Sequence, residues 1–163
     1  MAVVHAQGTI QYTANLGGAN EVTPNNSSAF GTGSLSLTGS TLAFVVSIHP
    51  GIGTTDAGFY GPASAGETNS QIFDLGTAHF VAPRDGFPGA VEYDGNFSLT
   101  SQQISDLQSG LWYVNIFTSA YPSGELRGQI QPVPEPMATV ICLFGGALAL
   151  AFRTLLYRRL NNR

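Results

Sequence analysis

The sequence predicts an all-β protein, an antiparallel β-sandwich or Greek-key barrel with one short helix, followed by a C-terminal transmembrane helix. Three observations predict this class. Short segments of alternating apolar and polar residues recur at intervals of about 8–12 residues. Turn-forming residues separate them, and Gly and Pro supply 29 of the 163 residues. Charged residues make up only 10% of the chain, against about 25% in an ordinary domain, which argues against a helical bundle.

Nine segments carry the strand pattern. In residues 41–49, Leu42, Phe44, Val46 and Ile48 share one face. Gly39-Ser40 precedes them as a turn, so this strand is expected to form a hairpin with the one before it. The expected strands are residues 9–16, 34–37, 41–49, 57–60, 71–75, 77–81, 95–99, 112–118 and 125–131.

One helix is expected at residues 101–108. Thr100 or Ser101 can cap its N-terminus, and Gly110 ends it. Turn residues between the strands include Pro50-Gly51, Pro88-Gly89 and Asp94-Gly95.

The charge is divided unevenly along the chain. Residues 1–133 hold two Arg and nine acidic residues, a formal charge of −7, whereas residues 134–163 hold four Arg and one Glu, a charge of +3. The acidic body provides no basic surface for phosphates, so no nucleic-acid partner is expected. An apolar run before a basic end predicts an exported body, a membrane segment and a cytoplasmic terminus. A single Cys excludes a disulfide framework.

The apolar run predicts a membrane helix over residues 137–157. Its first sixteen residues carry no charge and extend about 24 Å as a helix. Arg153 can reach the headgroups, and residues 158–163 form the basic cytoplasmic end. The alternative is a buried core helix, but the run has no polar face. Cys142, inside it, is expected to be an apolar filler.

The order of these C-terminal features resembles the PEP-CTERM sorting signal of bacteria. The residues that carry the resemblance are Val133, Pro134, Glu135, Pro136, Arg153, Arg158 and Arg159. It implies that residues 132–136 are a linker and that an exosortase-type transpeptidase processes the tail there. Residues 1–8 are expected to be disordered or the remnant of an export signal, because Val4-His5-Ala6 resembles the end of a signal peptide.

Three motifs stand out in the body. They are Asn20-Glu21-Val22-Thr23-Pro24 after a first strand, Gly61-Pro62-Ala63 before Ile72-Phe73-Asp74-Leu75, and Gly110-Leu111-Trp112 before Glu125-Leu126-Arg127-Gly128-Gln129. Together they resemble the CHRD domain, the module named after chordin, over residues 9–131. The resemblance implies a sandwich similar in outline to Cu/Zn superoxide dismutase. It also implies an extracellular module with no established enzymatic activity, so neither catalysis nor a cofactor is expected.

The resemblance also bears on metal binding. Proteins with a CHRD domain often carry two His at positions i and i+2 of one strand and a third His on a neighbouring strand. Such a pattern could bind a metal. The matching positions here are Gly58, Tyr60 and Phe117. Because glycine and phenylalanine side chains have no lone pair, no metal site is expected.

Other chemistry in the body is sparse. A metal site from His49, His79 and a carboxylate is the alternative, since His5 lies in the expected leader. Motifs for a Ser nucleophile, a zinc protease or a phosphate loop are absent from the sequence. Asp56 and Glu67 are expected to be solvated loop acids.

Two groups of residues are predicted to matter. Arg127 is expected to form a structural ion pair or clasping hydrogen bonds with Glu21 or Glu125, which would pin the first turn to the last strand. The second group is aromatic and either packs in the core or forms a partner surface: Phe59, Tyr60, Phe117 and Tyr121.

The expected function is that of an exported, surface-sorted module. It would have a structural, adhesive or binding role in the cell envelope or extracellular matrix. The expected partners are the sorting transpeptidase, the membrane and a matrix polysaccharide or protein. A metal-binding protein similar to superoxide dismutase is the alternative, disfavoured by the three replaced His positions.

Overall fold

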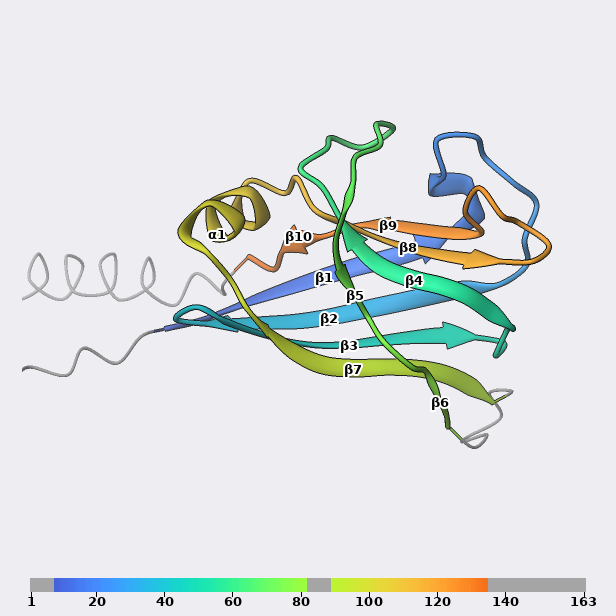
Figure 1. The fold of residues 1–163 in the computed structure, drawn as a ribbon, viewed down its shortest axis with the longest axis horizontal. Helices are drawn as coiled ribbons and strands as arrows, with labels where there is room; N and C mark the ends of the chain where they lie inside the picture. Colours follow the sequence, from blue (N-terminus) through green and yellow to red (C-terminus); the bar gives the residue numbers. More distant parts are fainter. Residues whose placement is uncertain (1–7, 82–88, 135–163) are drawn as a thin grey trace, which may run out of the picture. The chain divides into compact units, whose positions relative to one another are not determined.

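One curled antiparallel sheet forms the described part of the chain, residues 8–81 and 89–134 of a computed structural model (Figure 1). Met1–Val133 is one compact unit and Pro134–Arg163 a second, of which only Pro134 is described. The strands are β1 (Thr9–Gly17), β2 (Phe30–Thr38), β3 (Thr41–His49), β4 (Thr54–Tyr60), β5 (Gln71–Asp74), β6 (His79–Val81), β7 (Ala90–Ser98), β8 (Tyr113–Thr118), β9 (Leu126–Gln129) and β10 (Gln131–Pro132).

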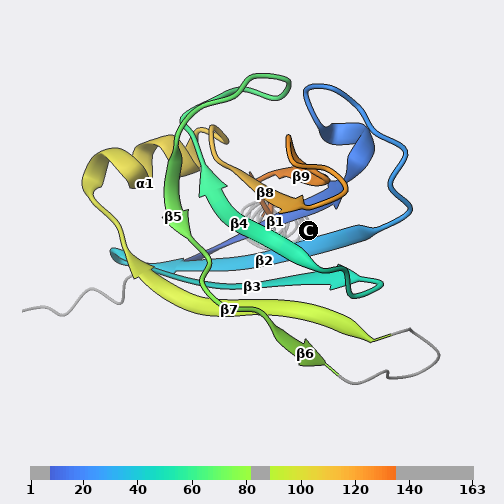
Figure 2. The same ribbon diagram turned by 45° about the vertical axis from the view of Figure 1, so that its right-hand side comes forward.

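The strands lie in the order β5-β4-β8-β9-β1-β2-β3-β7-β6, and β10 pairs with β1. The sheet curls so that β4, β5 and β8 lie over β2, β3 and β7 (Figure 2). The predicted antiparallel β fold with one short helix is therefore confirmed. The two facing layers arise from one continuous sheet, because β9 and β1 connect the upper strands to the lower ones.

Aromatic and aliphatic side chains fill the space between the layers. Phe44 of β3 meets Phe59 of β4 edge to face, with ring centroids 5.1 Å apart. Phe97 of β7 stacks on Phe73 of β5 at 4.2 Å. Trp112 is fully buried and lies 6.2 Å from the Phe59 ring. Each of these rings removes a large apolar area from water, which stabilises the curl.

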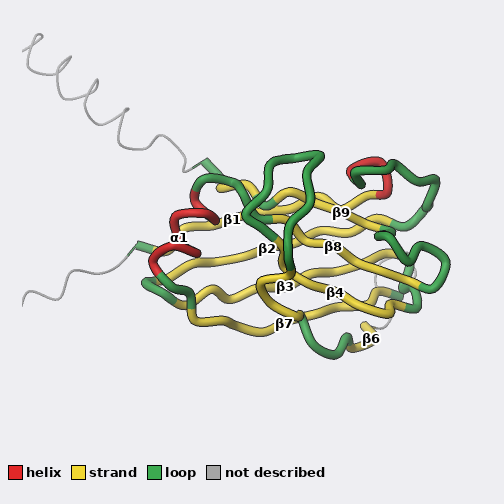
Figure 3. Tube along the Cα trace, turned by 45° about the horizontal axis from the view of Figure 1, so that its top comes forward, coloured by secondary structure: helices red, strands yellow, loops and turns green. Residues whose placement is uncertain are grey.

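The helix α1 (Ser101–Gln108) has the predicted bounds and lies at one end of the strands (Figure 3). Thr100 caps it: its hydroxyl accepts from the Gln103 backbone N–H, and the Gln103 side chain accepts from the Thr100 N–H at 2.9 Å. Leu107 is fully buried and packs the helix against the core.

Several strands differ from their predicted extents. β7 begins at Ala90, so the predicted turn at Asp94-Gly95 is wrong; Gly95 pairs with Phe44 instead. A Cβ at Gly95 would lie 3.3 Å from the Phe44 ring, so this glycine makes room for an aromatic side chain. β2 begins at Phe30, four residues earlier than predicted, and the expected strand 125–131 is divided into β9 and β10.

The C-terminal predictions fall on residues that the structure does not describe. Residues 135–163 are not described. They include the predicted membrane helix, Glu135, Pro136, Cys142 and every Arg of the predicted sorting signal. Within the described ranges, no helix is long and apolar enough to cross a membrane. His5 also lies outside the described residues.

Candidate functional site

Arg127 lies on the outer face of the sheet, on a strand that is paired on both sides. It belongs to β9 and pairs with Asn115 of β8 and with Gly17 of β1. Its neighbour Leu126 points into the core, so the alternation of a strand directs Arg127 away from it. Arg127 is nevertheless only 1% exposed, because loop 61–70 folds over this face.

The guanidinium of Arg127 has three partners. Nη2 donates to the carbonyl oxygens of Glu67, at 2.7 Å, and of Ser64, at 3.4 Å. The guanidinium carbon lies 3.5 Å from the centroid of the Tyr113 ring. Tyr60 stacks on Tyr113 with centroids 5.5 Å apart. A cation over an aromatic face and charge-assisted hydrogen bonds are both stabilising, so Arg127 ties the loop to the sheet.

The predicted ion pair takes a different form. The hydrogen bonds of Arg127 go to backbone carbonyls of loop 61–70 and not to Glu21 or Glu125, and the ion pairs among the described residues join His79 to Glu92 and Asp94. Glu125 accepts from the Ser27 hydroxyl at 2.6 Å and from the Thr118 hydroxyl. Each carboxylate oxygen of Glu125 therefore accepts from a hydroxyl, and Glu125 forms no ion pair with Arg127.

Glu21 follows the short helix η1 (Gly18–Asn20) and is buried, with 8% exposure. Its Oε1 has no hydrogen-bond partner. Burial raises the pKa of Glu21 to about 7, although the positive charge of Arg127 lowers it. At neutral pH the carboxyl group is therefore present in both its ionised and its protonated form.

Glu21 and Arg127 open onto one pocket of about 520 Å³, here called the Arg127 pocket. Its lining residues are Asn15, Ala19, Asn20, Glu21, Ala65, Gly66, Arg127 and Gln129. Three of the lining residues each carry one fully buried side-chain atom without a hydrogen-bond partner: Glu21 Oε1, Arg127 Nη1 and Gln129 Oε1. Buried polar groups in proteins are nearly always paired, so three unpaired ones on the residues of a single pocket are unusual.

The orientation of Gln129 is fixed by its other hydrogen bonds. Its Nε2 donates to the carbonyl oxygens of Gly110, at 2.7 Å, and of Ala63, at 2.9 Å. Because only the amide nitrogen can donate to a carbonyl, Oε1 must be the atom left unpaired. Sequence analysis did not single out Gln129. The sequence feature that could have identified it is its position two residues after Arg127, because residues i and i+2 of a strand lie on the same face.

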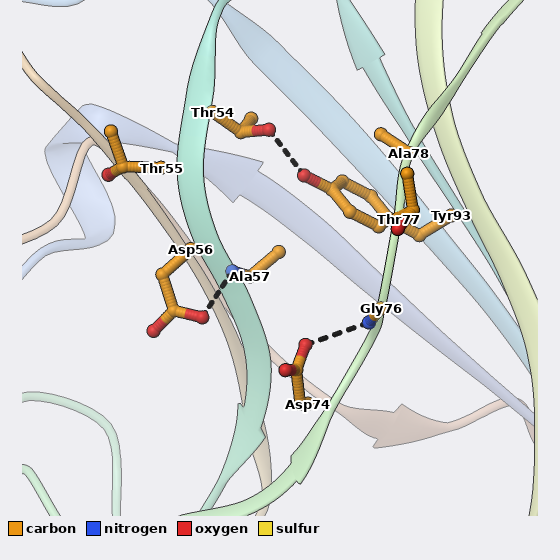
Figure 4. Close-up of a pocket in the computed structure, with 9 residues that line it drawn as sticks. All are labelled: Thr54, Thr55, Asp56, Ala57, Asp74, Gly76, Thr77, Ala78 and Tyr93. Carbon is orange, nitrogen blue, oxygen red and sulfur yellow. Dashed lines mark hydrogen bonds between the residues drawn. The ribbon is translucent and has the colours of Figure 1, made fainter.

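A second pocket, of about 340 Å³, lies between β4 and β7 (Figure 4). The Tyr93 hydroxyl donates to Thr54 across it. Asp56 accepts from the Ala57 N–H at 2.9 Å, and Asp74 accepts from the Gly76 N–H at 2.8 Å. These polar groups are satisfied within the wall itself, so this pocket presents less unmet hydrogen-bonding capacity than the Arg127 pocket.

The four predicted aromatic residues separate into two environments. Phe59 is 0% exposed and packs in the core, so the partner-surface interpretation does not hold for it. Tyr60, Phe117 and Tyr121 are half-buried, and the rings of Tyr60 and Phe117 lie 5.9 Å apart. The Tyr60 hydroxyl donates to Asp56 at 3.2 Å; burial first, and then the nearby Asp56 charge, raise the pKa of Tyr60.

The three positions that the resemblance matches to His are Gly58, Tyr60 and Phe117, and they lie close together. Gly58 pairs with Asn115, between Tyr60 and Phe117 on the same outer face. His49 stacks on Phe30 with centroids 5.6 Å apart, and His79 lies 3.2 Å from Asp94. In the described part of the chain, no group of three His, Cys, Asp or Glu residues is arranged to hold a metal ion.

Comparison with known proteins identifies the domain that carries these residues. No curated protein and no solved structure matches the chain. The model of the CHRD domain matches residues 12–130, which include Glu21, Arg127 and Gln129. Because this match covers most of the chain, the protein belongs to the CHRD domain family.

Proposed function

We propose that this protein is an exported, surface-sorted β-module that acts by binding through the Arg127 pocket, in the cell envelope or extracellular matrix. The observation that carries the proposal is a pocket of about 520 Å³ that is lined by two buried residues of opposite charge, Glu21 and Arg127, which form no ion pair with each other. Apart from Ala19, Ala65 and Gly66, every lining residue carries a charged or amide side chain. A polar ligand therefore fits this pocket better than an apolar one.

Binding is favoured over catalysis by what lines the pocket. A carboxyl group with a pKa near 7, such as Glu21, could serve as a general acid or base. A hydrolase also needs a nucleophile or a second carboxylate, and Glu21 is the one carboxylate among the described lining residues. The lining also contains no His, Ser, Thr or Cys.

Export and sorting are proposed from the sequence. The Pro-Glu-Pro motif at residues 134–136, the apolar run and the terminal Arg residues support processing by an exosortase-type transpeptidase. A metal-binding role similar to superoxide dismutase remains the alternative. Stoichiometric copper or zinc in the purified protein would support that alternative.

The test follows the protein in its native host. The intact mass is measured separately from membrane, cell-surface and extracellular fractions. A mass that ends near residues 133–136, found outside the membrane, is expected for a processed sorting signal. A mass that runs through Arg163, found in membranes alone, would contradict processing.

The binding role is tested in the same fractions with two variants. Glu21→Gln changes a pocket residue, and Glu92→Gln makes the same chemical change on β7, away from the pocket lining. We expect Glu21→Gln to release the processed protein into the medium and Glu92→Gln to remain at the surface. Equal retention of both variants would contradict a binding role for this pocket.

A further inference from the structure

The segment between η1 and β2 contains a buried carboxyl group but no buried apolar side chain before Ala29. Residues 21–28, here called the strap, form this segment. Glu21 is the one strap residue that is buried, and Val22 is 46% exposed. Because the burial of apolar side chains supplies most of the free energy that holds a segment in place, the strap depends on its polar contacts instead.

Two side chains tie the strap to the turn at residues 121–125, beside which it lies (Figure 1). Asn25 Nδ2 donates to the carbonyl oxygens of Gly124, at 3.2 Å, and of Glu125, at 3.0 Å. The Ser27 hydroxyl donates to Glu125 Oε1 at 2.6 Å. These contacts are all hydrogen bonds from strap side chains, so each can open without disturbing a pair of strands.

Both ends of the strap are anchored independently of that turn. Asn20 Nδ2 donates to the backbone carbonyl oxygens of Asn15, at 3.0 Å, and of Arg127, at 3.2 Å. At the other end, Phe30 begins β2 and pairs with Gly17 of β1. The strap can therefore separate from the turn while the sheet remains intact.

The Glu21 carboxyl group lies against the backbone of the same turn. A Cβ on Gly124 would lie 2.6 Å from Glu21 Oε1 and 2.8 Å from Oε2, so the carboxyl group packs on the Gly124 Cα. Oε1 is buried and has no hydrogen-bond partner. A neutral carboxyl group tolerates this contact, whereas a buried carboxylate without a partner carries a large desolvation cost. Ionisation of Glu21 therefore opposes the closed position of the strap.

The charged groups around Glu21 do not remove this cost. The positive charge of Arg127 on β9 lowers the pKa of Glu21, but burial raises it further, to about 7. Glu125, next to Gly124, is a second carboxyl group and disfavours another negative charge beside it. Glu67, in the loop that supplies Ala65 and Gly66 to the pocket wall, is exposed. The strap therefore meets its unfavourable charge in the neutral pH range.

We propose that the strap is a pH-sensitive closure of the Arg127 pocket, held shut when Glu21 is protonated and released when Glu21 is ionised. In the closed form Glu21 packs on the turn, and Asn25 and Ser27 bind it. In the released form the carboxylate turns into water and these hydrogen bonds break. The inference rests on the proposed binding function and assigns its regulation: Asn20 and Glu21 line the pocket, so release of the strap opens this wall to a ligand.

Amide hydrogen exchange of the full chain, in a zwitterionic detergent, measures the release. The reporters are the Asn25 amide, which donates to the Gly18 carbonyl, and the Ser27 amide, which donates to Asn25 Oδ1. Their protection factors, corrected for the intrinsic pH dependence of exchange, are compared at pH 5.5 and pH 8. With a Glu21 pKa of about 7 in the closed form and 4.5 in the released form, protection should fall about thirtyfold.

Two variants act on the strap in opposite ways. Glu21→Gln has no ionisable group at this place, so protection of the strap should not depend on pH. Gly124→Ala puts a methyl group against the Glu21 carboxyl group, so protection should be low already at pH 5.5. Glu92→Gln on β7 is the matched control and should behave as the natural protein. Amides of β3 should remain protected in every variant, which checks that the sheet is intact.

Equal protection of the strap at the two pH values in the natural protein would overturn the proposal. The same pH dependence in Glu21→Gln would also overturn it, and so would a parallel loss of protection in β3, because the whole sheet would then be opening. The binding function fails separately from its regulation. If surface retention in the host depends on Glu21 while the strap does not respond to pH, the proposed function stands and only its regulation is wrong.

Discussion

Arg127 is held by contacts that no local sequence pattern encodes. Its position in a distinctive motif predicted an architectural role, and the structure shows it clasping a loop about sixty residues earlier in the chain. Its partners are the carbonyls of Ser64 and Glu67 and the ring of Tyr113, rather than a carboxylate. Backbone carbonyls carry no residue-specific signal, so the sequence could predict that this cation is held but not which atoms hold it.

Arg127→Ala should destabilise the domain by more than about 2 kcal/mol. The variant removes the ring contact and leaves the partly buried carbonyls of Ser64 and Glu67 without their donor. Urea unfolding measures the loss. Arg127→Lys keeps the charge without the planar guanidinium, so its free energy of unfolding should lie between those of the natural protein and Arg127→Ala. An unfolding free energy unchanged in Arg127→Ala would contradict the clasp.

Glu21 makes stability depend on pH. Its pKa is about 7 in the folded protein against 4.5 as the ordinary value, so the folded state binds the proton more tightly than the unfolded state. The contribution of Glu21 to the free energy of unfolding should therefore be greatest below pH 4.5. It should fall as the pH rises and level off above pH 7. The full loss is about 3 kcal/mol.

Glu21→Gln should remove this pH dependence and be more stable than the natural protein at pH 8. Urea unfolding at several pH values between 4.5 and 8 measures it, with Glu92→Gln as the matched control. Parallel pH profiles for the natural protein and Glu21→Gln would contradict a buried, ionisable Glu21.

At the level of elements, the alternation of apolar residues located most strands and the capping residue located the helix. The segment 41–49 and the helix 101–108 have the predicted bounds, because their patterns are uninterrupted. β2 and β7 were predicted too short, since Gly31, Gly33 and Gly95 interrupt the pattern. A Cβ at Gly31 would lie 2.8 Å from the Ser47 carbonyl oxygen. Sequence patterns cannot separate a glycine of this kind from one in a turn.

The loop before β9 positions Glu21 through Gly124. Gly124 has a φ of +122°, and a Cβ there would lie 2.6 Å from Glu21 Oε1. Gly124→Ala should therefore cost about 1–3 kcal/mol and displace Glu21. Gly53→Ala, where a Cβ meets nothing within 4 Å, should be neutral or slightly stabilising. Thermal unfolding compares them, and equal midpoints for the two variants would contradict the close contact.

For the molecule as a whole, the pocket exists because the sheet brings distant segments together. Residues 15, 19–21, 65–66, 127 and 129 form its wall. The apolar faces of the strands predicted two packed layers, but the curl of one continuous sheet depends on strand order, which the local pattern does not specify. The sequence predicted that Glu21 or Glu125 would lie near Arg127, but Gln129 could not be assigned to the same site before the fold was known.

Truncation of the buried Phe59 should destabilise the core between the layers, whereas truncation of the exposed Phe80 should not. Phe59 is 0% exposed and contacts the rings of Phe44 and Phe97 in the facing layer, whereas Phe80 is 69% exposed. Phe59→Ala should cost about 3–5 kcal/mol, and Phe80→Ala should lie within about 0.5 kcal/mol of the natural protein. Denaturant unfolding measures both, and a small effect at Phe59 would contradict the packed curl.

The central claim is that Glu21 and Arg127 face a pocket as separate groups instead of neutralising each other as an ion pair. The most direct measurement is the pKa of the Glu21 carboxyl group, from a ¹³C NMR titration assigned with Glu21→Gln. The account predicts a value of about 7. A value at or below 4.5, the ordinary pKa, would mean that Glu21 and Arg127 neutralise each other as an ion pair and that the pocket is not the site.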